Sequence, residues 1–485
     1  MKNLGLNPPE RIIRYKWVIR IVVVIVCLAF WNMVDYNIRA LKAAAARSEE
    51  DVSVLNYEEV IFQKVLPESN YYYFDEPLQE MFISQEVTDI EEQTNLKYCG
   101  ASTCRFLFPV FVKEQESRAR LHMRRIMMLA KKTNRVLVLP NVGDARLGAC
   151  KSFPFGFYYS IDVIQQSPNI RVITQSQFLS WNQEMREINA KIPTAKIVSL
   201  DCSYKIKKEH MESKRINLET YKNYSCMQPF SLDYEDKMLD IRTRKTFKDR
   251  AQIAQFVTDG LRSVQSDVLL MQYSFTRFNY PNLHRMAPPL KYADHLIERA
   301  KSAASLIRPY IAIHWRMESA EAGNLVNCSV RLVKYIEWIK RETKIKNVYI
   351  ATDYPFDGGR AHSGTFHSLT NDHHKAANVL KNNLNFYTWT HLNSSLSTFN
   401  NTTFLSNKEE APKERDREDS GILGTLDKLM LVHANWFISG PPGCARTQSS
   451  YTAQVRKERF ARVREQATVD ELSENDYLLN IKDMW

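Results

Sequence analysis

The C-terminal part of the chain alternates between helical and strand patterns, and this alternation limits its possible folds more than any other feature. Apolar residues spaced three and four apart indicate amphipathic helices, and short continuous apolar runs indicate buried strands. Helices that alternate with buried strands place a parallel sheet between layers of helices, so the region from about residue 290 is predicted to be a doubly wound α/β domain. The helices are predicted at Ala293–Ile307, Arg331–Lys344 and Thr425–Ala434, and the strands at Tyr310–Arg316, Asn347–Asp353 and Asn435–Gly440.

The same pattern occurs once nearer the N-terminus. The segment Leu121–Lys132 has helical spacing, and the apolar run Arg135–Pro140 that follows it is typical of a buried strand. A chain of 485 residues exceeds what one hydrophobic core usually supports, so two domains are expected, at residues 93–288 and 289–485. The polar segment His391–Ser420 is interpreted as a surface loop.

The most apolar stretch of the chain lies near its N-terminus. The eighteen residues Trp17–Val34 contain one charge, Arg20, and a helix of this length approaches the ~30 Å hydrocarbon thickness of a membrane. Basic residues precede the stretch and Asp35 follows it, so the positive-inside rule places the rest of the chain in the lumen. We therefore expect a cytosolic tail (1–16), a transmembrane signal anchor (17–34) and a stem (35–92), with a cleaved signal peptide as the alternative.

Cysteines and glycosylation sequons agree with a lumenal location. One of the eight cysteines lies in the predicted span, and most of the other seven are expected to pair in an oxidising compartment, with one left over. Their connectivity stays open. Five Asn-x-Ser/Thr sequons are candidate acceptors of N-glycans, and three of them cluster in the polar segment: Asn223, Asn327, Asn393, Asn400 and Asn401.

The excess of basic residues does not point to one kind of partner. The formal net charge is +11, which is compatible with a membrane surface, an anionic small molecule or simply a basic solvated surface. The sequence contains no zinc-finger spacing, basic-zipper pattern or aromatic RNA-binding signature. These absences disfavour a nucleic-acid partner.

Polar residues follow each of the three C-terminal strands. Ligands of open α/β sheets bind beyond the carboxyl ends of the strands, so these residues are the candidates for a site. An arginine offers a planar fork of donors that matches phosphate oxygens, and a carboxylate two residues later can orient it. Each residue alone is equally a surface residue, but three strand ends at one edge favour a diphosphate site. The residues are His314, Arg316 and Glu318, then Thr352 and Asp353, then Ser439 to Ser450.

The segment after the third strand has the composition of an anion-binding turn. The sequence GPPGCARTQSS precedes a helical segment that begins YTAQVRKERF. Such a turn presents backbone N–H groups and hydroxyls at a helix N-terminus, where the helix dipole favours negative charge. An ordinary surface loop is the alternative.

These motifs, taken in order, resemble those of the GDP-fucose protein O-fucosyltransferase family. The matching segments are HWRME, VYIATD and LDKLMLVHANWFIS followed by SSYTAQVRKER, with EQESRARLHMRRIMMLAKKTNRVLVLP (Glu114 to Pro140) upstream. Each segment is short and unspecific alone. Their order and spacing over about 370 residues carry the resemblance.

The resemblance implies a GT-B fold, in which two Rossmann-like domains face each other across a cleft, here preceded by the transmembrane helix. It also implies a GDP-sugar donor, GDP-fucose, and no metal or other cofactor. Arg316 matches the arginine that grips the diphosphate and stabilises the departing GDP. By the same resemblance His314, Asp353, Ser449, Ser450 and Tyr451 are expected to bind substrate, the last standing where phenylalanine is usual. Glu318, Asp427 and Arg446 are further candidates for substrate binding.

Two departures from the family pattern concern the site. The turn before Ser449 is longer than usual, and the glycine-rich entry of the family is only partly matched by Cys104-Arg105-Phe106. The catalytic base is therefore assigned from position alone. Glu114 is the first candidate and Glu116 the second, because carboxylates before this helix are expected to face the cleft. The alternative is that these acids stabilise a helix N-terminus.

Four histidines within thirteen residues suggest a metal at first sight: His362, His367, His373 and His374. Their spacing is not that of an ordered ligand set, so no metal is predicted.

The function expected from the sequence is transfer of fucose to a hydroxyl acceptor, such as a Ser or Thr of a protein, in the Golgi or endoplasmic reticulum. The expected partners are a GDP-sugar, a protein or glycan acceptor and the membrane. Two alternatives stay open: a related transferase that uses another GDP-sugar or a glycan acceptor, and an inactive lumenal binding protein.

Overall fold

A computed structural model describes residues 89–485 except 168–169, 189–190, 202–223, 243–246, 248, 275–277, 357–365, 367, 398–418, 441–443, 445–448, 468–479 and 483–485. The predicted tail, signal anchor and most of the stem lie outside these residues. Within the described part, no helix is both long and apolar enough to cross a membrane. The described residues all belong to one compact unit, Glu76–Trp485.

The first sheet is nine-stranded and mostly parallel. Its central strand β1 (Phe106–Val112) pairs in parallel with β2 (Val136–Leu139) and with β9 (Val268–Ser274). The remaining strands are β3 (Val142–Gly143), β4 (Arg146–Gly148), β5 (Val172–Thr174), β6 (Thr194–Asp201), β7 (Asp233–Tyr234) and β8 (Leu239–Arg242). Of these, β4 is antiparallel to β1 and to β3.

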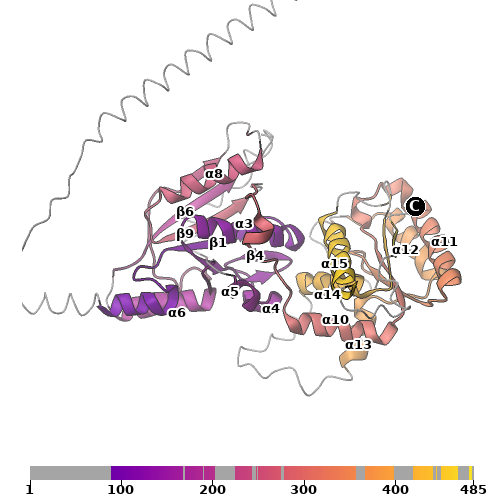
Figure 1. Cartoon of the computed structure of the whole chain (residues 1–485). Coiled ribbons are helices and arrows are strands. Elements are labelled where there is room, and N and C mark those ends of the chain that lie inside the picture. Colours follow the sequence, from indigo (N-terminus) through magenta and orange to yellow (C-terminus); the bar gives the residue numbers. More distant parts are fainter. Residues whose placement is uncertain are drawn as a thin grey trace, which may run out of the picture. The chain divides into compact units, whose positions relative to one another are not determined.

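Side chains of β1 alternate between two hydrophobic cores because the sheet is covered on both faces. Leu107 and Val112 belong to the core that includes α3 (Glu116–Lys132) and α8 (Arg250–Arg262), whereas Phe106 and Phe108 pack against α6 (Gln175–Glu187). Figure 1 shows α6 on the opposite side of these strands from α3 and α8. The short helices of this region are α4 (Phe155–Tyr158), α5 (Asp162–Gln165) and α9 (Leu283–Met286).

The second sheet consists of four parallel strands in the order β11-β10-β12-β13. The strands are β10 (Tyr310–His314), β11 (Asn347–Ala351), β12 (Trp436–Ser439) and β13 (Asn480–Lys482). The helices are α10 (Asp294–Ile307), α11 (Leu325–Thr343), α12 (Asn371–Asn383), α13 (Trp389–Ser397), α14 (Ser420–His433) and α15 (Ser450–Ala467), with 3-10 turns at Met317–Ser319 and Ala322–Asn324.

The second sheet is doubly wound, as the sequence predicted. In β10, Tyr310 and Ala312 face the core shared with α10 and α14, while Ile311 and Ile313 face the core shared with α11 and α12. An α/β fold with parallel sheets is therefore confirmed. The predicted boundary at residue 288 lies between the two sheets and stays a prediction.

One predicted segment differs from the structure. The polar segment from His391 was expected to be a loop, but its first residues belong to α13, whose Trp389 and Leu392 are buried. A helix also covers residues 89–99, and the predicted end of the stem at residue 92 stays a prediction.

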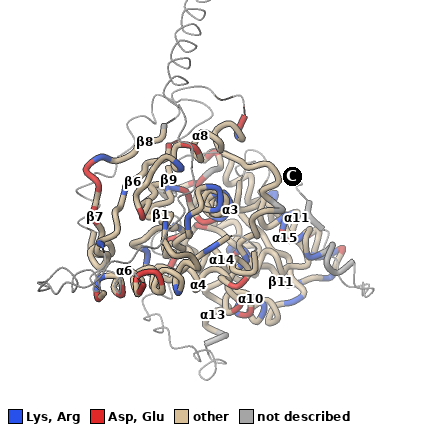
Figure 2. Tube along the Cα trace, turned by 60° about the vertical axis from the view of Figure 1, so that its left-hand side comes forward, with Lys and Arg blue, Asp and Glu red and all other residues tan. Residues whose placement is uncertain are grey.

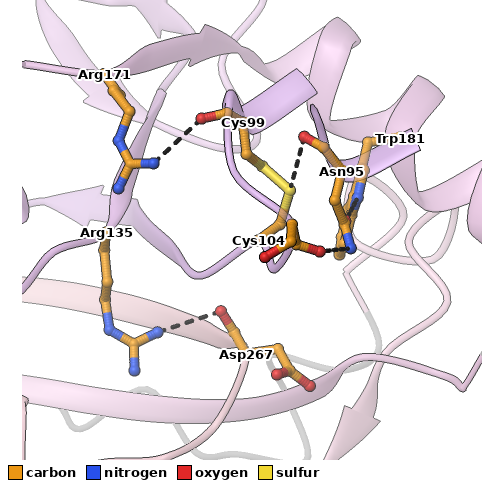
Figure 3. The surroundings of a disulfide bond; sticks show 8 residues. Asn95, Cys99, Cys104, Arg135, Arg171, Trp181 and Asp267 are labelled. Atoms are coloured by element: carbon orange, nitrogen blue, oxygen red, sulfur yellow. Dashed lines mark hydrogen bonds between the residues drawn. A yellow bond between two sulfur atoms is a disulfide. The ribbon is translucent and has the colours of Figure 1, made fainter. Parts of the chain in front are cut away.

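Three disulfides connect six of the seven predicted lumenal cysteines: Cys99–Cys104, Cys150–Cys226 and Cys328–Cys444. The seventh, Cys202, lies outside the described residues. Around the first disulfide, Trp181 donates to Asn95 at 3.0 Å and Arg171 donates to the carbonyl of Cys99 at 3.2 Å (Figure 3). Disulfides of this number indicate an oxidising compartment.

Basic and acidic residues are interspersed along the described elements (Figure 2). Lys301 and Glu298 form an exposed pair on α10. The solvated interpretation of the positive net charge stays a prediction.

Candidate functional site

The carboxyl ends of three neighbouring strands lie level at one edge of the second sheet. His314, the last residue of β10, is in register with Ala351 of β11 and with Ser439 of β12. The residues after these strands therefore start from the same edge. This is the convergence that the sequence predicted from three separate motifs.

Two hydrogen bonds donated by Trp315 connect the segments that follow the three strands. Its backbone N–H donates to the carbonyl of Ala351 at 3.1 Å, and its indole N–H donates to the carbonyl of Cys444 at 3.0 Å. Cys444 lies in the turn after β12 and is also joined by a disulfide to Cys328 of α11. Thr352 completes the arrangement by donating to the carbonyl of Trp315 at 2.9 Å.

The end of β10 meets the N-terminus of α15. The imidazole of His314 stacks on the ring of Tyr451 with centroids 4.5 Å apart, and its Nδ1 lies 2.9 Å from the hydroxyl oxygen of Thr452. Burial, together with the charges of Arg316 and Lys428, lowers the pKa of His314 to about 3. His314 is therefore neutral at physiological pH, and its ring helps to position the start of the helix.

Ser449 and Ser450 stand at the N-terminus of α15, as predicted. Ser449 is buried, and its hydroxyl oxygen lies 3.4 Å from the backbone nitrogen of Thr452, so it faces the first turn of the helix. Ser450 is the first helical residue. This helix end offers N–H groups and a positive dipole at the same edge as His314.

Arg316 lies among acidic side chains. Its Nε forms an ion pair with Glu318, whose side chain is 5% exposed. Burial and the negative charge of Glu318 together raise the pKa of Asp353 to about 7, although the charge of Arg316 opposes them. Burial also raises the pKa of Asp427 to about 7, while the hydrogen bond from Tyr349 opposes this. At neutral pH these carboxyls are partly protonated, which limits the repulsion between them.

Glu116 is enclosed in a buried network. Its Oε2 lies 2.5 Å from Nζ of Lys428, and its Oε1 accepts from the hydroxyls of Tyr292 at 2.7 Å and Tyr159 at 3.2 Å. Burial favours the protonated form, but Lys428 and Arg120 outweigh it and lower the pKa of Glu116 to about 2. A carboxylate with so low a pKa and both oxygens occupied is a poor general base, so the candidacy of Glu116 is corrected.

Glu114 lies just before α3, and both of its carboxylate oxygens are 3.4 Å from a guanidinium nitrogen of Arg118. Its side chain is 11% exposed. Its role as a base stays a prediction.

The other predicted residues divide between described and undescribed segments. Asn327 is exposed on α11, and the side chain of Asn393 on α13 accepts a hydrogen bond from Arg299 at 2.6 Å.

Two of the histidines that first suggested a metal have other partners. His373 caps the start of α12 through Thr370, and His374 contacts the hydroxyl of Tyr354 at 2.8 Å. Within the described residues no group of three His, Cys, Asp or Glu side chains is arranged to hold a metal ion. Arg446, Asn223, Asn400, Asn401, His362 and His367 lie outside the described residues.

Sequence reasoning missed Lys428, whose side chain is completely buried. It also missed Tyr349 and Thr452, which contact Asp427 and His314. The available signal for Lys428 was a lysine inside the otherwise apolar helix TLDKLMLVHA. A charge there is expected to have a buried partner, but nothing in the local sequence identifies that partner.

The fold and the strand-edge site define an α/β protein of the kind that binds ligands beyond the ends of parallel strands. No protein-family model and no curated protein matches the chain. Among solved structures, the chain is similar to POFUT1 in complex with GDP, at 15% identity and a TM-score of 0.40 over 74% of this chain and 96% of that chain.

Two further solved structures are similar to the chain. POFUT1 in complex with GDP-fucose matches at 14% identity and a TM-score of 0.38 over 73% of this chain and 94% of that chain. The fucosyltransferase NodZ from Bradyrhizobium matches at 12% identity and a TM-score of 0.32, over 73% and 92%. The solved structures to which the chain is similar thus include a fucosyltransferase. These similarities are too low to assign an activity or a residue's role to this chain.

Proposed function

We propose that the chain is an inverting, metal-independent glycosyltransferase of GT-B type that transfers fucose from GDP-fucose to a hydroxyl acceptor. The observation that carries the proposal is the strand edge of the second sheet. There Arg316 follows β10, and the N-terminus of α15 contacts the end of the same strand through His314. A guanidinium and a helix N-terminus at one edge are the groups that a pyrophosphate needs.

In this proposal the leaving diphosphate is stabilised by Arg316 and by the N–H groups at the start of α15. One such donor placed at developing charge is worth about 3–4 kcal/mol of transition-state stabilisation. Glu318 orients the guanidinium of Arg316 by pairing with its Nε. Asp353 and Asp427 contact the nucleoside or ribose, and Glu114 accepts the proton of the acceptor hydroxyl.

The compartment follows from the same proposal. Residues 17–34 anchor the chain as a type II membrane protein, and the catalytic part lies in the lumen of the Golgi or endoplasmic reticulum. The three disulfides support an oxidising lumen. Asn327, exposed on α11, is then available for an N-glycan.

The proposal is tested by thermal shifts of the full-length chain in detergent with GDP, UDP and CMP sugars. A ligand present at 100 times its Kd stabilises the folded state by about 2.7 kcal/mol, so GDP compounds are expected to raise the melting temperature selectively. Arg316→Ala should remove most of this shift and the transfer of labelled fucose.

The outcomes separate the alternatives. Stabilisation by GDP-mannose but not GDP-fucose would assign a different donor, and binding of GDP-fucose without transfer or hydrolysis would indicate an inactive binding protein. Selective stabilisation by UDP compounds, or a fully active Arg316→Ala variant, would contradict the proposal.

A further inference from the structure

The buried network around Lys428 connects three helices that come from distant parts of the sequence. Lys428 on α14 is 0% exposed and contacts Glu116 at 2.5 Å, Tyr292 at 2.8 Å, Gln454 at 3.0 Å and Ser117 at 3.1 Å. Glu116 and Ser117 form the first turn of α3, and Gln454 lies near the start of α15. One ammonium group therefore joins the beginnings of α3 and α15.

A second ion pair extends the same connection. Arg120, one turn further along α3, pairs with Glu458 of α15 at 3.0 Å and lies over the ring of Tyr292 at 4.2 Å. Its Nε is also 3.8 Å from Glu116. The network thus contains two cations and two carboxylates, Lys428 and Arg120 with Glu116 and Glu458, and its formal charges balance.

Net stability does not explain why such a network is present. Removing two charges from water costs several kcal/mol, and a well-packed apolar cluster of the same volume is often at least as stable. What the charged network adds is a fixed geometry, because every donor of Lys428 needs a partner at a defined place. Its location indicates which geometry is fixed. Glu114 lies two residues before Glu116, and Ser450 lies four residues before Gln454.

We propose that Lys428, with Glu116 and Gln454, is a positioning residue that holds the start of α3 at a fixed distance from the start of α15. The inference rests on the proposed function, in which the start of α3 carries the acceptor's base and the start of α15 carries the diphosphate. Lys428 touches neither substrate. It keeps the acceptor side and the donor side in reactive alignment, and a misplacement of about 1 Å between reacting groups can cost about 100-fold in rate.

The test uses the double variant Glu116→Gln/Lys428→Met in the full chain, which removes the ion pair without leaving an unpaired buried charge. Hydrogen exchange without ligand should become at least tenfold faster at residues 114–120 and 450–456, with α11 unchanged. Transfer of fucose should show a kcat at least 30-fold lower, with the Kd for GDP within threefold of wild type. A structural role alone would not separate kcat from Kd in this way.

Two further variants protect the test against misfolding and non-specific effects. Gln454→Met removes the hydrogen bond between Lys428 and Gln454 together with the bond that the Gln454 amide donates to the carbonyl of Ser117, and should change exchange and kcat in the same direction. Glu298→Gln breaks an exposed ion pair with Lys301 on α10, outside the network, and should leave exchange at the two helix starts unchanged and kcat within threefold. It is the control, since it removes one carboxylate without changing α3, α14 or α15.

The proposal is overturned if exchange at the two helix starts is unchanged in the double variant, or if kcat is unchanged although exchange accelerates. It is also overturned if kcat and GDP affinity fall together. Absence of transfer in the wild type would contradict the proposed function, and hydrogen exchange would still decide whether Lys428 joins the two helix starts.

Discussion

At the scale of one residue, Asp427 keeps its proton in the folded protein at pH values where an ordinary aspartate is ionised. Its carboxyl accepts from the hydroxyl of Tyr349, and burial raises its pKa to about 7. In the unfolded chain an aspartate has a pKa near 4. Between these two values the native protein holds a proton that the unfolded chain has released, so this residue makes the protein less stable as pH rises from about 4 to 7.

Asp427→Asn removes this titration while preserving an oxygen that accepts from Tyr349. The free energy of unfolding of the variant, relative to wild type, should therefore rise between pH 5 and pH 8 by at least about 1 kcal/mol, the equivalent of roughly one pKa unit. Urea unfolding at a series of pH values measures the difference.

Tyr349→Phe provides the companion variant. The hydroxyl of Tyr349 lowers the pKa of Asp427, so its loss should raise that pKa and extend the pH-dependent loss of stability to higher pH. A difference between Asp427→Asn and wild type that is independent of pH would show that Asp427 is ionised throughout.

Individual residues were predictable where the backbone alone determines their place. The positions of His314, Arg316 and Asp353 at one sheet edge were predictable because parallel strands bring their carboxyl ends together, whereas their roles stay predictions. Glu116 was assigned to the wrong role because its partner Lys428 lies 312 residues away in the sequence. A helix N-terminal glutamate looks the same in a sequence whether it faces a cleft or a buried lysine.

At the scale of elements, strands were predicted more accurately than loops. The strands β2, β10, β11 and β12 all lie within their predicted apolar runs, since a continuous apolar run between turns is buried on both faces. Helix α13 was missed because its sequence is mostly polar and its packing depends on two side chains, Trp389 and Leu392.

Helix α14 contains two glycines in opposite surroundings, which gives a prediction at this scale. A Cβ on Gly421 would lie 2.5 Å from the backbone nitrogen of Ala145 and 2.8 Å from the hydroxyl of Tyr158. Ala145 is in a turn with φ of 56°, so its backbone has little freedom to move. Gly421→Ala should destabilise the protein by about 1–3 kcal/mol through overpacking.

Gly424→Ala is the matched control, because a Cβ there meets no atom within 4 Å. Alanine is favoured over glycine in a helix by about 0.5–1 kcal/mol, so this variant should be more stable than wild type. Denaturant unfolding of both variants compares them directly. Equal effects of the two substitutions would contradict the contact between α14 and the turn at Ala145.

At the scale of the whole molecule, two of the disulfides close loops of very different length. Cys328–Cys444 spans 116 residues, a segment that includes β11, β12 and α14, whereas Cys99–Cys104 spans five. The pairing was open at the level of sequence, because the spacing of cysteines does not say which of them meet. In the structure, the Cys328–Cys444 disulfide, which closes the longer loop, joins the turn after β12 to α11.

A cross-link stabilises a protein mainly by restricting the unfolded chain, and the restriction grows with loop length. Chain entropy gives about 5 kcal/mol for the longer loop and about 2 kcal/mol for the shorter one. Cys328→Ser/Cys444→Ser should therefore lower the free energy of unfolding more than Cys99→Ser/Cys104→Ser, measured by urea unfolding at one pH. The longer bond also supports the turn that accepts from Trp315, so its loss should weaken GDP binding as well. A larger loss of stability in the Cys99/Cys104 variant would mean that native contacts around that bond, such as those of Asn95 and Trp181, outweigh loop entropy.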